Sequence, residues 1–533
     1  MDHSFAYLPY KNTGFFSALV KDYLDNAPEI QPFYGFAPTA SGLNEAIAAR
    51  PAYDVNRTAL VAALTKQYAH LTTTPQATDN IQALLSENTF TICTAHQPNL
   101  MTGYLYFIYK ILHAIKLAEE LNALHPDKYF VPVYYMGSED NDIEELGTFR
   151  FRGDKYVWDG DGQTGAVGRM NTAGLKPMVQ QMFKLYGPPG KNCDDLQNMV
   201  EQAYLHHKTI GEATHYLVNE LFGRFGLVVI NPDEAILKQQ YIQVMQDELL
   251  HQNAHPIINA QIDKLGAHYK IQANPRSINL FYLTNQLRER IEQKGDKWTV
   301  VNTGIEWNEV ELIAELHEHP ERFSPNVMLR GMYQETILPN VAFIGGGAEV
   351  AYWLQLKTLF AHYGVFYPSI HLRQSVLWAG AADAALREKL ELTIADLFAP
   401  LLQLEREYVT NHSGNDWQIA AEIDALEQLF ATIKAKATAT DPTLSAASGS
   451  ALHKMKSQIA TLEKKMLKAE KRKMDVHMAR IEKLKNSLFP KNSLQERVEN
   501  FMEFYLNYGP EFMDVTKEGI RPLEPQFLVV EAR

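Results

Sequence analysis

Three consecutive stretches between residues 89 and 136 constrain the fold of this chain most. Residues 89–95 are β-branched and apolar, as in a buried strand, and residues 129–136 form a second apolar run. Between them, residues 104–121 repeat apolar side chains at the spacing of a helix. This order predicts a βαβ unit, because two parallel strands need a crossover connection. We therefore expect an α/β fold with a Rossmann-like parallel sheet.

Later segments extend this core. The apolar runs 226–231, 341–344 and 365–370 predict further buried strands. Residues 268–283 and 297–305 alternate apolar and polar side chains, which is typical of short antiparallel strands, and we interpret them as an insertion into the sheet domain. The expected domains are a core of residues 1–380 with N-terminal helices and connecting segments at roughly 150–215 and 255–325, a helical coiled-coil domain of residues 381–508, and a tail of residues 509–533 that returns to the core.

The helical domain shows a charge pattern as well as a hydrophobic one. Residues 452–487 place apolar side chains at alternating spacings of four and three, which predicts a coiled-coil seam with a register slip near Lys473. This stretch holds eleven Lys and Arg against four Asp and Glu, whereas residues 383–436 hold five against ten. Opposite charges favour an antiparallel hairpin, with residues 437–450 as a flexible linker. Solvated outer faces would explain part of the same charge.

Composition excludes several classes of protein. The 533 residues are 46% hydrophobic and carry a formal net charge of −13, so disorder and a general nucleic-acid binder are disfavoured. The basic helix lacks the interleaved aromatic residues of a single-strand binder. Two cysteines, Cys93 and Cys193, form neither a disulfide framework nor a metal motif, which indicates a reducing cytoplasm. No apolar run reaches the roughly 20 residues of a membrane span, and no signal peptide is expected.

Ligands of open α/β sheets bind beyond the carboxyl ends of the strands, which directs attention to the loop after the first strand. His96, Gln97, Asn99, Thr102 and Gly103 lie in this loop, just before a helix. Polar side chains and free helix amides there suit a phosphate or a carboxylate. The loop has neither a GxGxxG nor a Walker pattern, and His96 as a simple helix cap is the alternative.

An acidic cluster follows the second strand. Glu139, Asp140 and Asp142 are costly to crowd together unless they bind an amine, a metal with nucleotide, or an arginine. Capping of a helix by Ser138 with acids in the first turn is the alternative, and the two roles are compatible. We expect no dedicated metal site.

A third polar cluster contains Arg330, Gln334, Glu349 and Tyr352 around three consecutive glycines, 345–347. The glycines follow a predicted strand and open a helix, so their amides are available to an anion. A structural tight turn is the alternative. Cys93 lies within a predicted buried strand, and we expect it to be a core residue rather than a nucleophile.

Long ordered motifs at these clusters resemble the bacillithiol-biosynthesis cysteine-adding enzyme family, BshC, over the full length. They are Cys-Thr-Ala-His-Gln (93–97), Tyr-Phe-Ile-Tyr-Lys (106–110), Ala-Ile-Lys-Leu-Ala (114–118), the run 132–142 ending in Gly-Ser-Glu-Asp-Asn-Asp, Gly-Ala-Val-Gly-Arg-Met (165–170), the run 320–330, Gln-Glu-Thr-Ile-Leu-Pro (334–339) and Ile-Gly-Gly-Gly-Ala-Glu-Val-Ala-Tyr-Trp (344–353). Two positions depart from the family pattern. His96 stands where the family often has Gln, and Asn141 stands where its Glu-Asp-His-Asp signature has His, so an acid–base role of that histidine does not carry over.

The resemblance implies a Rossmann-like core related to class I aminoacyl-tRNA synthetases and nucleotidyltransferases, inserted connecting segments, and a coiled-coil domain that forms a homodimer. The implied reaction joins cysteine to the amine of glucosaminyl-malate and yields bacillithiol as the last pathway step. A synthetase-like enzyme acting on another amino acid or sugar acid, or a non-enzymatic coiled-coil scaffold, remains an alternative.

Amide formation in water requires an activated carboxyl group, so we expect ATP as a co-substrate through an acyl-adenylate or an acyl-phosphate. The expected catalytic residues are His96, Glu139 and Asp140: His96 with Thr102 at the leaving group, and the two acids at an amino group. Expected substrate contacts are Gln97, Asn99, Asp142, Arg276, Arg330, Gln334, Glu349, Tyr352 and Arg373, and expected nucleotide contacts are Thr102, Gly103, Gly345, Gly346 and Gly347. The arginines suit the malate carboxylates because guanidinium binds carboxylate in a bidentate manner, although each could form an internal salt bridge instead.

Overall fold

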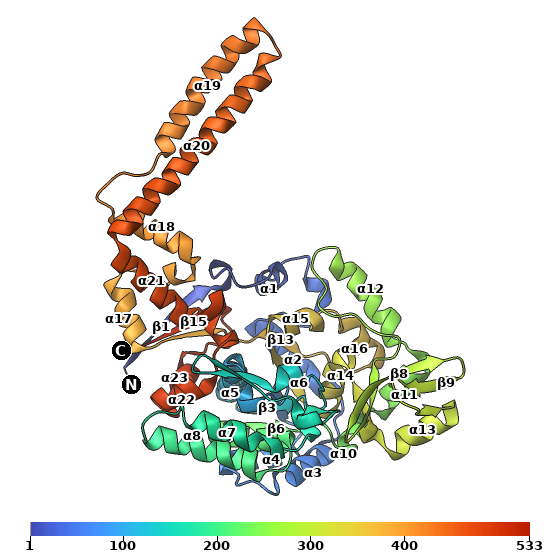
Figure 1. Ribbon diagram of the computed structural model, residues 1–533. Helices are drawn as coiled ribbons and strands as arrows, with labels where there is room; N and C mark the ends of the chain where they lie inside the picture. The colour runs from blue at the N-terminus through green and yellow to red at the C-terminus, as the bar shows by residue number, and fades with distance from the viewer. Residues whose placement is uncertain (1) are drawn as a thin grey trace. The chain divides into compact units, whose positions relative to one another are not determined.

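A sheet of five parallel strands forms the centre of the computed structural model, which describes residues 2–533 (Figure 1). Its order is β13 (Ser369–Leu372), β12 (Asn340–Gly345), β2 (Thr89–His96), β3 (Tyr129–Met136) and β6 (Val228–Ile230). Every neighbouring pair is parallel. The predicted Rossmann-like parallel core is therefore confirmed.

The two faces of β2 explain why this segment is apolar throughout. Phe90 and Ile92 pack with Leu117 and Leu121 of helix α5 (Tyr106–Leu124), which crosses over from β2 to β3. The next residue, Cys93, is completely buried, and it is a free thiol, as expected for a core position. Both faces of a parallel sheet are covered, so its strands show apolar runs rather than alternation.

Helices on either side of the sheet complete the core. The N-terminal ones are α1 (Ala18–Leu24), α2 (Ala40–Ala49), α3 (Arg57–Tyr68) and α4 (Pro75–Ala83). Those after β6 are α10 (Ala235–Lys238), α11 (Ile242–His251), α12 (Ala254–Gly266), α14 (Val327–Ile337), α15 (Gly347–Trp353) and α16 (Lys357–Tyr363).

Two insertions interrupt the parallel core. The first contains α6 (Ile143–Leu146), the hairpin β4 (Thr148–Phe151) and β5 (Asp154–Val157), and the helices α7 (Lys176–Phe183), α8 (Lys191–Glu201) and α9 (Ile210–Phe222). The second contains an antiparallel sheet in the order β10 (Glu306–Trp307), β9 (Lys297–Val300), β8 (Leu287–Lys294), β7 (Leu280–Thr284) and β11 (Phe323–Pro325), with helix α13 (Glu309–Glu318). The expectation of strand from residue 268 is wrong for residues 268–279, where α12 has just ended and Pro275 interrupts the chain.

The last part of the chain returns to the sheet unit. Strand β15 (Gln526–Ala532) lies between β1 (His3–Pro9) and β14 (Val376–Ala379), after helices α22 (Phe501–Tyr508) and α23 (Glu511–Gly519). Among the described residues, the compact unit that holds the sheet comprises residues 2–378 and 493–531. The expected domain boundary at residue 508 thus differs from the structure, because Gln495 and Glu496 are already buried in the sheet unit.

The second compact unit, essentially residues 379–492, is helical. Its helices are α17 (Ala381–Lys389), α18 (Leu401–His412), α19 (Ala420–Thr440), α20 (Leu444–Lys473) and α21 (Asp475–Leu488). The expected flexible linker 437–450 is wrong: α19 and α20 continue through most of it and leave only residues 441–443 as a turn. The Asp441 carboxylate accepts the Thr443 N–H and closes this turn. The residues on either side of the turn are helical although they lack the apolar spacing of a buried helix.

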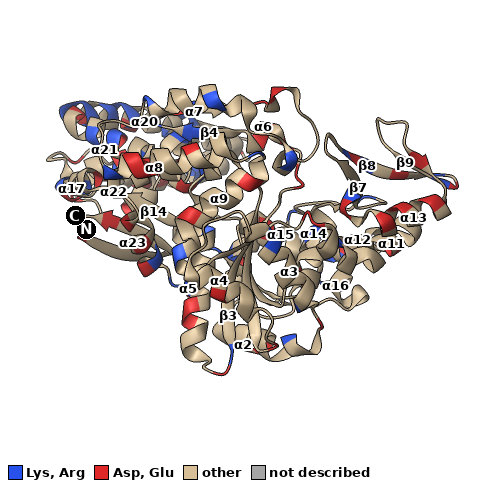
Figure 2. Ribbon diagram, turned by 90° about the horizontal axis from the view of Figure 1, so that it is seen from below, with Lys and Arg blue, Asp and Glu red and all other residues tan. Residues whose placement is uncertain are grey.

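The hairpin follows the predicted charges. Glu427 of α19 pairs with Lys456 of α20, and Glu405 of α18 pairs with Lys471 of α20 at 2.5 Å, both with the predicted polarity. The pair of Arg406 with Glu463 at 3.1 Å has the reverse polarity. Figure 2 shows Lys and Arg concentrated on α20 and α21. The helix breaks between Lys473 and Asp475, at the predicted register slip. No helix within residues 2–533 has the length and apolar character needed to cross a membrane.

Candidate active site

A cavity of about 390 Å³ lies where β2, β3 and β12 end, at the carboxyl edge of the parallel sheet. It is lined by ten of the expected site residues: His96, Gln97, Glu139, Asp140, Arg330, Gly346, Gly347, Glu349, Tyr352 and Arg373. The three sequence clusters therefore meet in one place, because parallel strands bring their carboxyl ends to the same edge.

His96 is the last residue of β2. Its ring lies 5.4 Å from the ring of Tyr106, and its Nε2 is buried without a hydrogen-bond partner among residues 2–533. Burial, together with the positive charges of Lys110, Arg373 and Arg330, lowers the pKa of His96 well below its usual value. The imidazole is therefore neutral near pH 7 and offers an uncharged nitrogen to the cavity.

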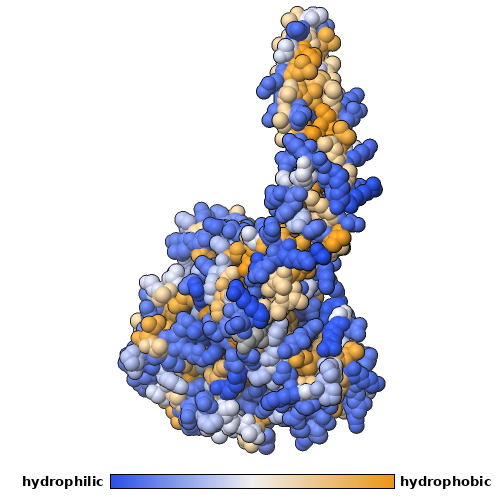
Figure 3. All heavy atoms as spheres, turned by 90° about the vertical axis from the view of Figure 1, so that its left-hand side faces the viewer, coloured by the Kyte–Doolittle hydropathy of each residue, from blue (hydrophilic) through white to orange (hydrophobic). Residues whose placement is uncertain are grey.

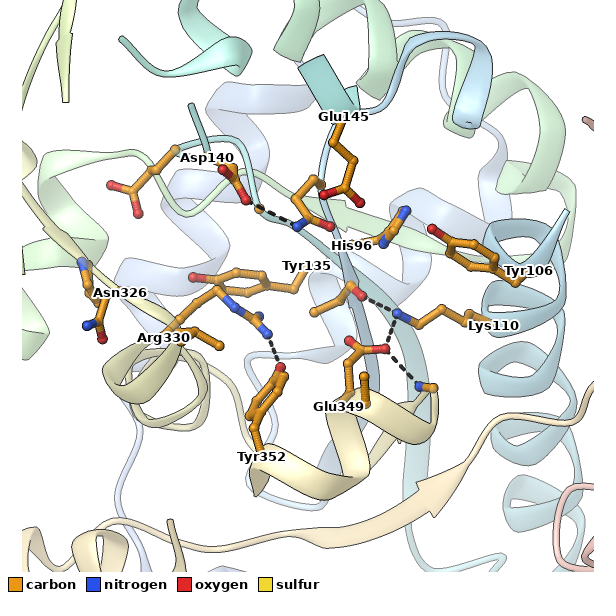
Figure 4. A pocket seen from close by; sticks show the side chains of 18 of the residues that line it. His96, Tyr106, Lys110, Tyr135, Asp140, Glu145, Asn326, Arg330, Glu349 and Tyr352 are labelled. Carbon is orange, nitrogen blue, oxygen red and sulfur yellow. Dashed lines mark hydrogen bonds and ion pairs between the residues drawn. The ribbon is translucent and has the colours of Figure 1, made fainter. Parts of the chain in front are cut away.

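Lys110 links two of the three strand ends (Figure 4). Its ammonium group donates to the Ala95 carbonyl and to the Glu349 carboxylate, both at 2.6 Å. The same Glu349 oxygen accepts the Gly346 N–H at 2.8 Å. Burial lowers the pKa of Lys110, and Glu349 opposes this effect. Glu349 is thus a fixed member of the wall, and its partner Lys110, which lies in the 106–110 motif quoted for the family, was not among the expected site residues.

The acidic cluster separates into paired and unpaired carboxylates. Glu139 forms an ion pair with the completely buried Lys238 at 2.5 Å, so its charge is already neutralised. Burial raises the pKa of Glu139, and Lys238 counteracts the shift. Asp140 accepts a hydrogen bond from Gln97 at 3.1 Å and has no cationic partner within ion-pair distance in residues 2–533. Of the two acids expected at an amino group, only Asp140 remains available.

Glu145 is a further acid in the wall. It comes from α6, at the start of the first insertion, and lines the cavity close to Asp140 (Figure 4). Burial and the charges of Asp142 and Asp140 raise the pKa of Glu145. A carboxylate with a raised pKa accepts a proton more readily, which suits a general base.

Arg330 projects from α14 into the cavity, on the side away from His96 (Figure 4). Its Nη2 donates to the Tyr352 hydroxyl at 2.5 Å, and its guanidinium lies 5.7 Å from the centre of the Tyr135 ring. Its Nη1 is buried and has no hydrogen-bond partner within residues 2–533. A guanidinium group keeps its charge in proteins. Arg330 is therefore a desolvated cation with a spare donor at the cavity wall.

Arg373 follows β13 and forms the internal salt bridge that the sequence left as an alternative. Its two terminal nitrogens bind the carboxylate of Glu496 at 2.8 and 2.7 Å, and both side chains are buried. The guanidinium also lies 5.4 Å from the centre of the Tyr106 ring. Arg373 lines the cavity, but it offers no free bidentate fork to a malate carboxylate.

Comparisons with known proteins agree with this geometry. The model of the BshC N-terminal Rossmann-like domain of bacillithiol biosynthesis matches residues 4–374, and that of the BshC C-terminal coiled-coil domain matches residues 380–532. The chain belongs to the BshC family. A protein of Flavobacterium johnsoniae named "Putative cysteine ligase BshC" is 39% identical, with 98% of this chain and 99% of the relative covered. Proteins of the same name from Christiangramia forsetii and Cytophaga hutchinsonii are each 39% identical, over 98% and 92% of both chains.

The family assignment confirms an enzyme of the ligase class and disfavours a non-enzymatic scaffold. Several expected residues of this BshC-family protein nevertheless lie outside the cavity. Asp142 is exposed and caps α6 by accepting the Glu145 N–H, whereas Ser138, the cap considered from the sequence, donates to Asn231 instead. Arg276 lines a different cavity, and Gln334 is buried with its amide bound to Glu335. Gly345 lies within β12, beneath the side chain of Phe343.

The expected phosphate-binding turn is also closed. Asn99, Thr102 and Gly103 are not part of the cavity wall, and Asn99 and Thr102 are buried. Asn500 donates to the carbonyls of Met101 and Gly103 and covers this turn from the far end of the sequence. Thr102 and Gly103 both have positive φ, so the loop makes a tight turn before α5 begins at Tyr106. The contact with Asn500 has no signal in the local sequence.

The remaining wall residues come from segments that the sequence analysis did not assign to the site. Tyr106, Tyr135 and Asn326 lie within motifs quoted for the family, whereas Arg288 belongs to the second insertion and Arg497 follows the helical unit. Arg288 reaches Asn141 at 3.1 Å, so the position that departs from the family signature is used for this contact. Across residues 2–533, no group of three His, Cys, Asp or Glu side chains is arranged to hold a metal ion.

Proposed function

We propose that this protein ligates cysteine to the amine of glucosaminyl-malate and so forms bacillithiol, with ATP activating the cysteine carboxylate. The membership in the BshC family and the names of the relatives support this activity. The observation that best supports the proposal is that the cavity wall contains a cation, Arg330, and two acids, Asp140 and Glu145, that are not joined in ion pairs within residues 2–533. Both substrates carry an ammonium group and at least one carboxylate, so they need such a pair of subsites.

Arg330 supports the anionic subsite. A half-buried cation whose only side-chain hydrogen-bond partner is a neutral phenol has lost water at its buried Nη1 without gaining a counter-ion there. A malate carboxylate beside Nη1 would supply the missing charge and acceptor. Asn326, which lines the same side of the cavity, is held by its own hydrogen bonds to Asn279 and Met328. It shapes this subsite rather than reaching into it.

Asp140 and Glu145 support the cationic subsite. Both lie above Arg330 and Tyr352 in the view of Figure 4, and Glu139 is excluded by its pair with Lys238. An ammonium group bound there would lose its proton to one of the two carboxylates before attack. Glu145 suits this role because of its raised pKa.

The chemical step follows from these positions. ATP and the cysteine carboxylate form an acyl-adenylate with release of pyrophosphate, or an acyl-phosphate with release of ADP. The neutral amine then attacks the activated carbonyl, the C–N bond forms, the C–O bond to phosphorus breaks, and the phosphorylated group leaves. The neutral His96, at the end of β2, would donate or accept a hydrogen bond at the reacting carbonyl, and it carries no positive charge to repel the ammonium.

The direct test is a reconstitution with the full-length protein, cysteine, glucosaminyl-malate and ATP, with mass spectrometry of the thiol product. Bacillithiol is expected, and its absence from a folded preparation would refute the activity. Cysteine-dependent exchange of pyrophosphate into ATP supports the adenylate, whereas ADP formation supports the phosphate. The variants Asp140→Asn and Glu145→Gln separate the two candidate bases, and Glu144→Gln, at an exposed position of α6 outside the cavity, is the matched control.

We also propose a homodimer through the coiled-coil hairpin and a cytoplasmic location. No side chain of α19 is buried, and Leu429, Met455 and Leu462 are 56%, 43% and 55% exposed. Figure 3 shows apolar side chains gathered along this hairpin. A second copy would cover them, and light scattering should give twice the chain mass for the protein and a monomer for Leu429→Glu/Leu462→Glu. A reducing location agrees with the two free thiols.

A further inference from the structure

The segment 493–500, which we call the strap, links the end of the helical unit to the active-site wall. It lies within the range matched by the coiled-coil domain model, residues 380–532. In the structure it belongs to the compact unit of the parallel sheet. The boundary between the two family domains in the sequence therefore differs from the boundary between the two compact units, and a segment of the second family domain belongs to the unit that holds the active site.

Three buried side chains fix the strap. Gln495 accepts the Trp378 N–H and donates to the Trp378 carbonyl, at 3.0 and 2.9 Å. Glu496 binds Arg373 through both carboxylate oxygens, and it also accepts the Val376 N–H. Asn500 holds the 101–103 turn through two backbone carbonyls. A segment with this many buried polar contacts keeps one conformation, because each broken contact would leave a desolvated group.

Arg497 is the exception within the strap. Its neighbour Glu496 is completely buried, whereas Arg497 is exposed and lines the cavity. No ion pair or side-chain hydrogen bond engages Arg497 anywhere in residues 2–533, while Lys110, Lys238 and Arg373 of the same site are each paired with a carboxylate. The strap therefore presents one uncompensated cation to the cavity.

The contacts of the strap place Arg497 on the His96 side. Glu496 holds Arg373, whose guanidinium lies 5.4 Å from the centre of the Tyr106 ring, and Tyr106 is the neighbour of His96. Glu499 of the strap accepts the Leu105 N–H at the start of α5. Arg330 lies on the opposite side, as Figure 4 shows.

We propose that Arg497 binds the phosphate groups of the nucleotide at the mouth of the cavity. This inference rests on the proposed function and makes it more specific. An exposed guanidinium suits a polyphosphate, which stays partly hydrated and must leave as pyrophosphate, AMP or phosphate. The half-buried Arg330, whose Nη1 is shielded from solvent, in contrast suits a carboxylate that stays in the product. The strap is therefore a part of the catalytic unit, and Glu496 is its positioning residue.

The test compares Arg497→Gln with Arg521→Gln in the full-length protein. Arg521 is exposed, pairs with Glu524 and lies outside the cavity, so it controls for the charge change. Binding of ATP and of L-malate is measured by calorimetry, and KM is measured for each substrate. Arg497→Gln should weaken ATP binding and raise KM for ATP at least tenfold, with malate binding and KM for cysteine unchanged within twofold. Arg497→Lys should recover part of the loss.

Each outcome decides the inference. Unchanged ATP parameters in Arg497→Gln, weaker malate binding instead, or an equal effect of Arg521→Gln would overturn it, and so would a wild-type protein that binds no ATP. The proposed function fails separately: a wild-type protein that binds ATP through Arg497 but makes no bacillithiol refutes the ligation and leaves the phosphate subsite in place. If the wild-type protein forms bacillithiol and Arg497→Gln leaves its ATP parameters unchanged, the ligation stands and the phosphate subsite at Arg497 is refuted.

Discussion

The contact between Arg330 and Tyr352 allows the anionic subsite to be tested by stability as well as by activity. Tyr352 is the only hydrogen-bond partner of the Arg330 guanidinium among the interactions of residues 2–533. Tyr352 is buried, and Arg330 is half-buried with its Nη1 shielded from solvent. Tyr352→Phe removes one hydroxyl and leaves the charge without any acceptor. The expected loss of unfolding free energy is about 1.5–3 kcal/mol, the range for a hydrogen bond to a buried charged group.

The double variant Arg330→Met/Tyr352→Phe removes the charge and its partner together. Two apolar side chains of similar volume need no hydrogen bonds, so this variant should be within about 1 kcal/mol of wild type and more stable than Tyr352→Phe alone. Urea unfolding followed by circular dichroism and tryptophan fluorescence measures these differences, and Trp353, beside Gly331 of α14, reports on the site.

The order of the two variants should be reversed for activity: the more stable double variant should be the less active one. The double variant should lose at least about 100-fold in kcat/KM for glucosaminyl-malate, because a charge-assisted contact to a substrate carboxylate is worth about 2–5 kcal/mol in a desolvated site. Tyr352→Phe keeps the guanidinium and should lose less. The reasoning is refuted if Tyr352→Phe is as stable as wild type, or if the stable double variant retains activity.

Three further predictions concern buried groups of the sheet unit. Lys110→Met should cost about 3–5 kcal/mol of unfolding free energy by leaving Glu349 without its cation, and Lys110→Met/Glu349→Leu should recover most of it in urea unfolding. Burial raises the pKa of Glu248 from 4.5 to about 7; since this folded-state pKa lies above the unfolded one, Glu248 favours folding below about pH 4.5 and loses that contribution as the pH rises to about 7. Glu248→Gln should flatten stability across this interval, and an unchanged profile would contradict the assignment. Asn500→Ala should lower the unfolding free energy by about 1–3 kcal/mol, since two buried carbonyls of the 101–103 turn lose their donor, and a variant as stable as wild type would show that water replaces it.

Local pattern was sufficient for the central sheet. The strand at residues 129–136 and the helix between β2 and β3 follow from apolar spacing alone, because a buried parallel strand and a crossover helix leave clear signals. The prediction of a flexible linker at 437–450 was wrong for a related reason. No side chain of α19 is buried, so the sequence shows no apolar spacing that would indicate that this helix continues to residue 440.

The site was predictable only where chemistry follows a strand. His96, Asp140 and Gly346 are each placed by the end of a strand, and the rule that ligands bind at the carboxyl edge was enough to group them. Long-range partners decide the rest. Nothing near Glu139 in the sequence announces Lys238, and nothing near Gly103 announces Asn500, yet these contacts determine which groups remain available to a ligand.

The charges of the cavity divide into those that build it and those left for substrates. Lys110 with Glu349, Lys238 with Glu139, and Arg373 with Glu496 are pairs at 2.5–2.7 Å that join separate segments of the chain. Removing one partner of such a pair leaves the other charge buried without a counter-ion, so substitution of these residues lowers stability whether or not they take part in catalysis. Within residues 2–533, Arg330, Arg497, Asp140 and Glu145 form no such ion pair, although the charge of Asp140 raises the pKa of the neighbouring Arg288 against the effect of burial. Loss of stability on mutation should therefore mark the first group, and loss of substrate affinity in a stable protein should mark the second.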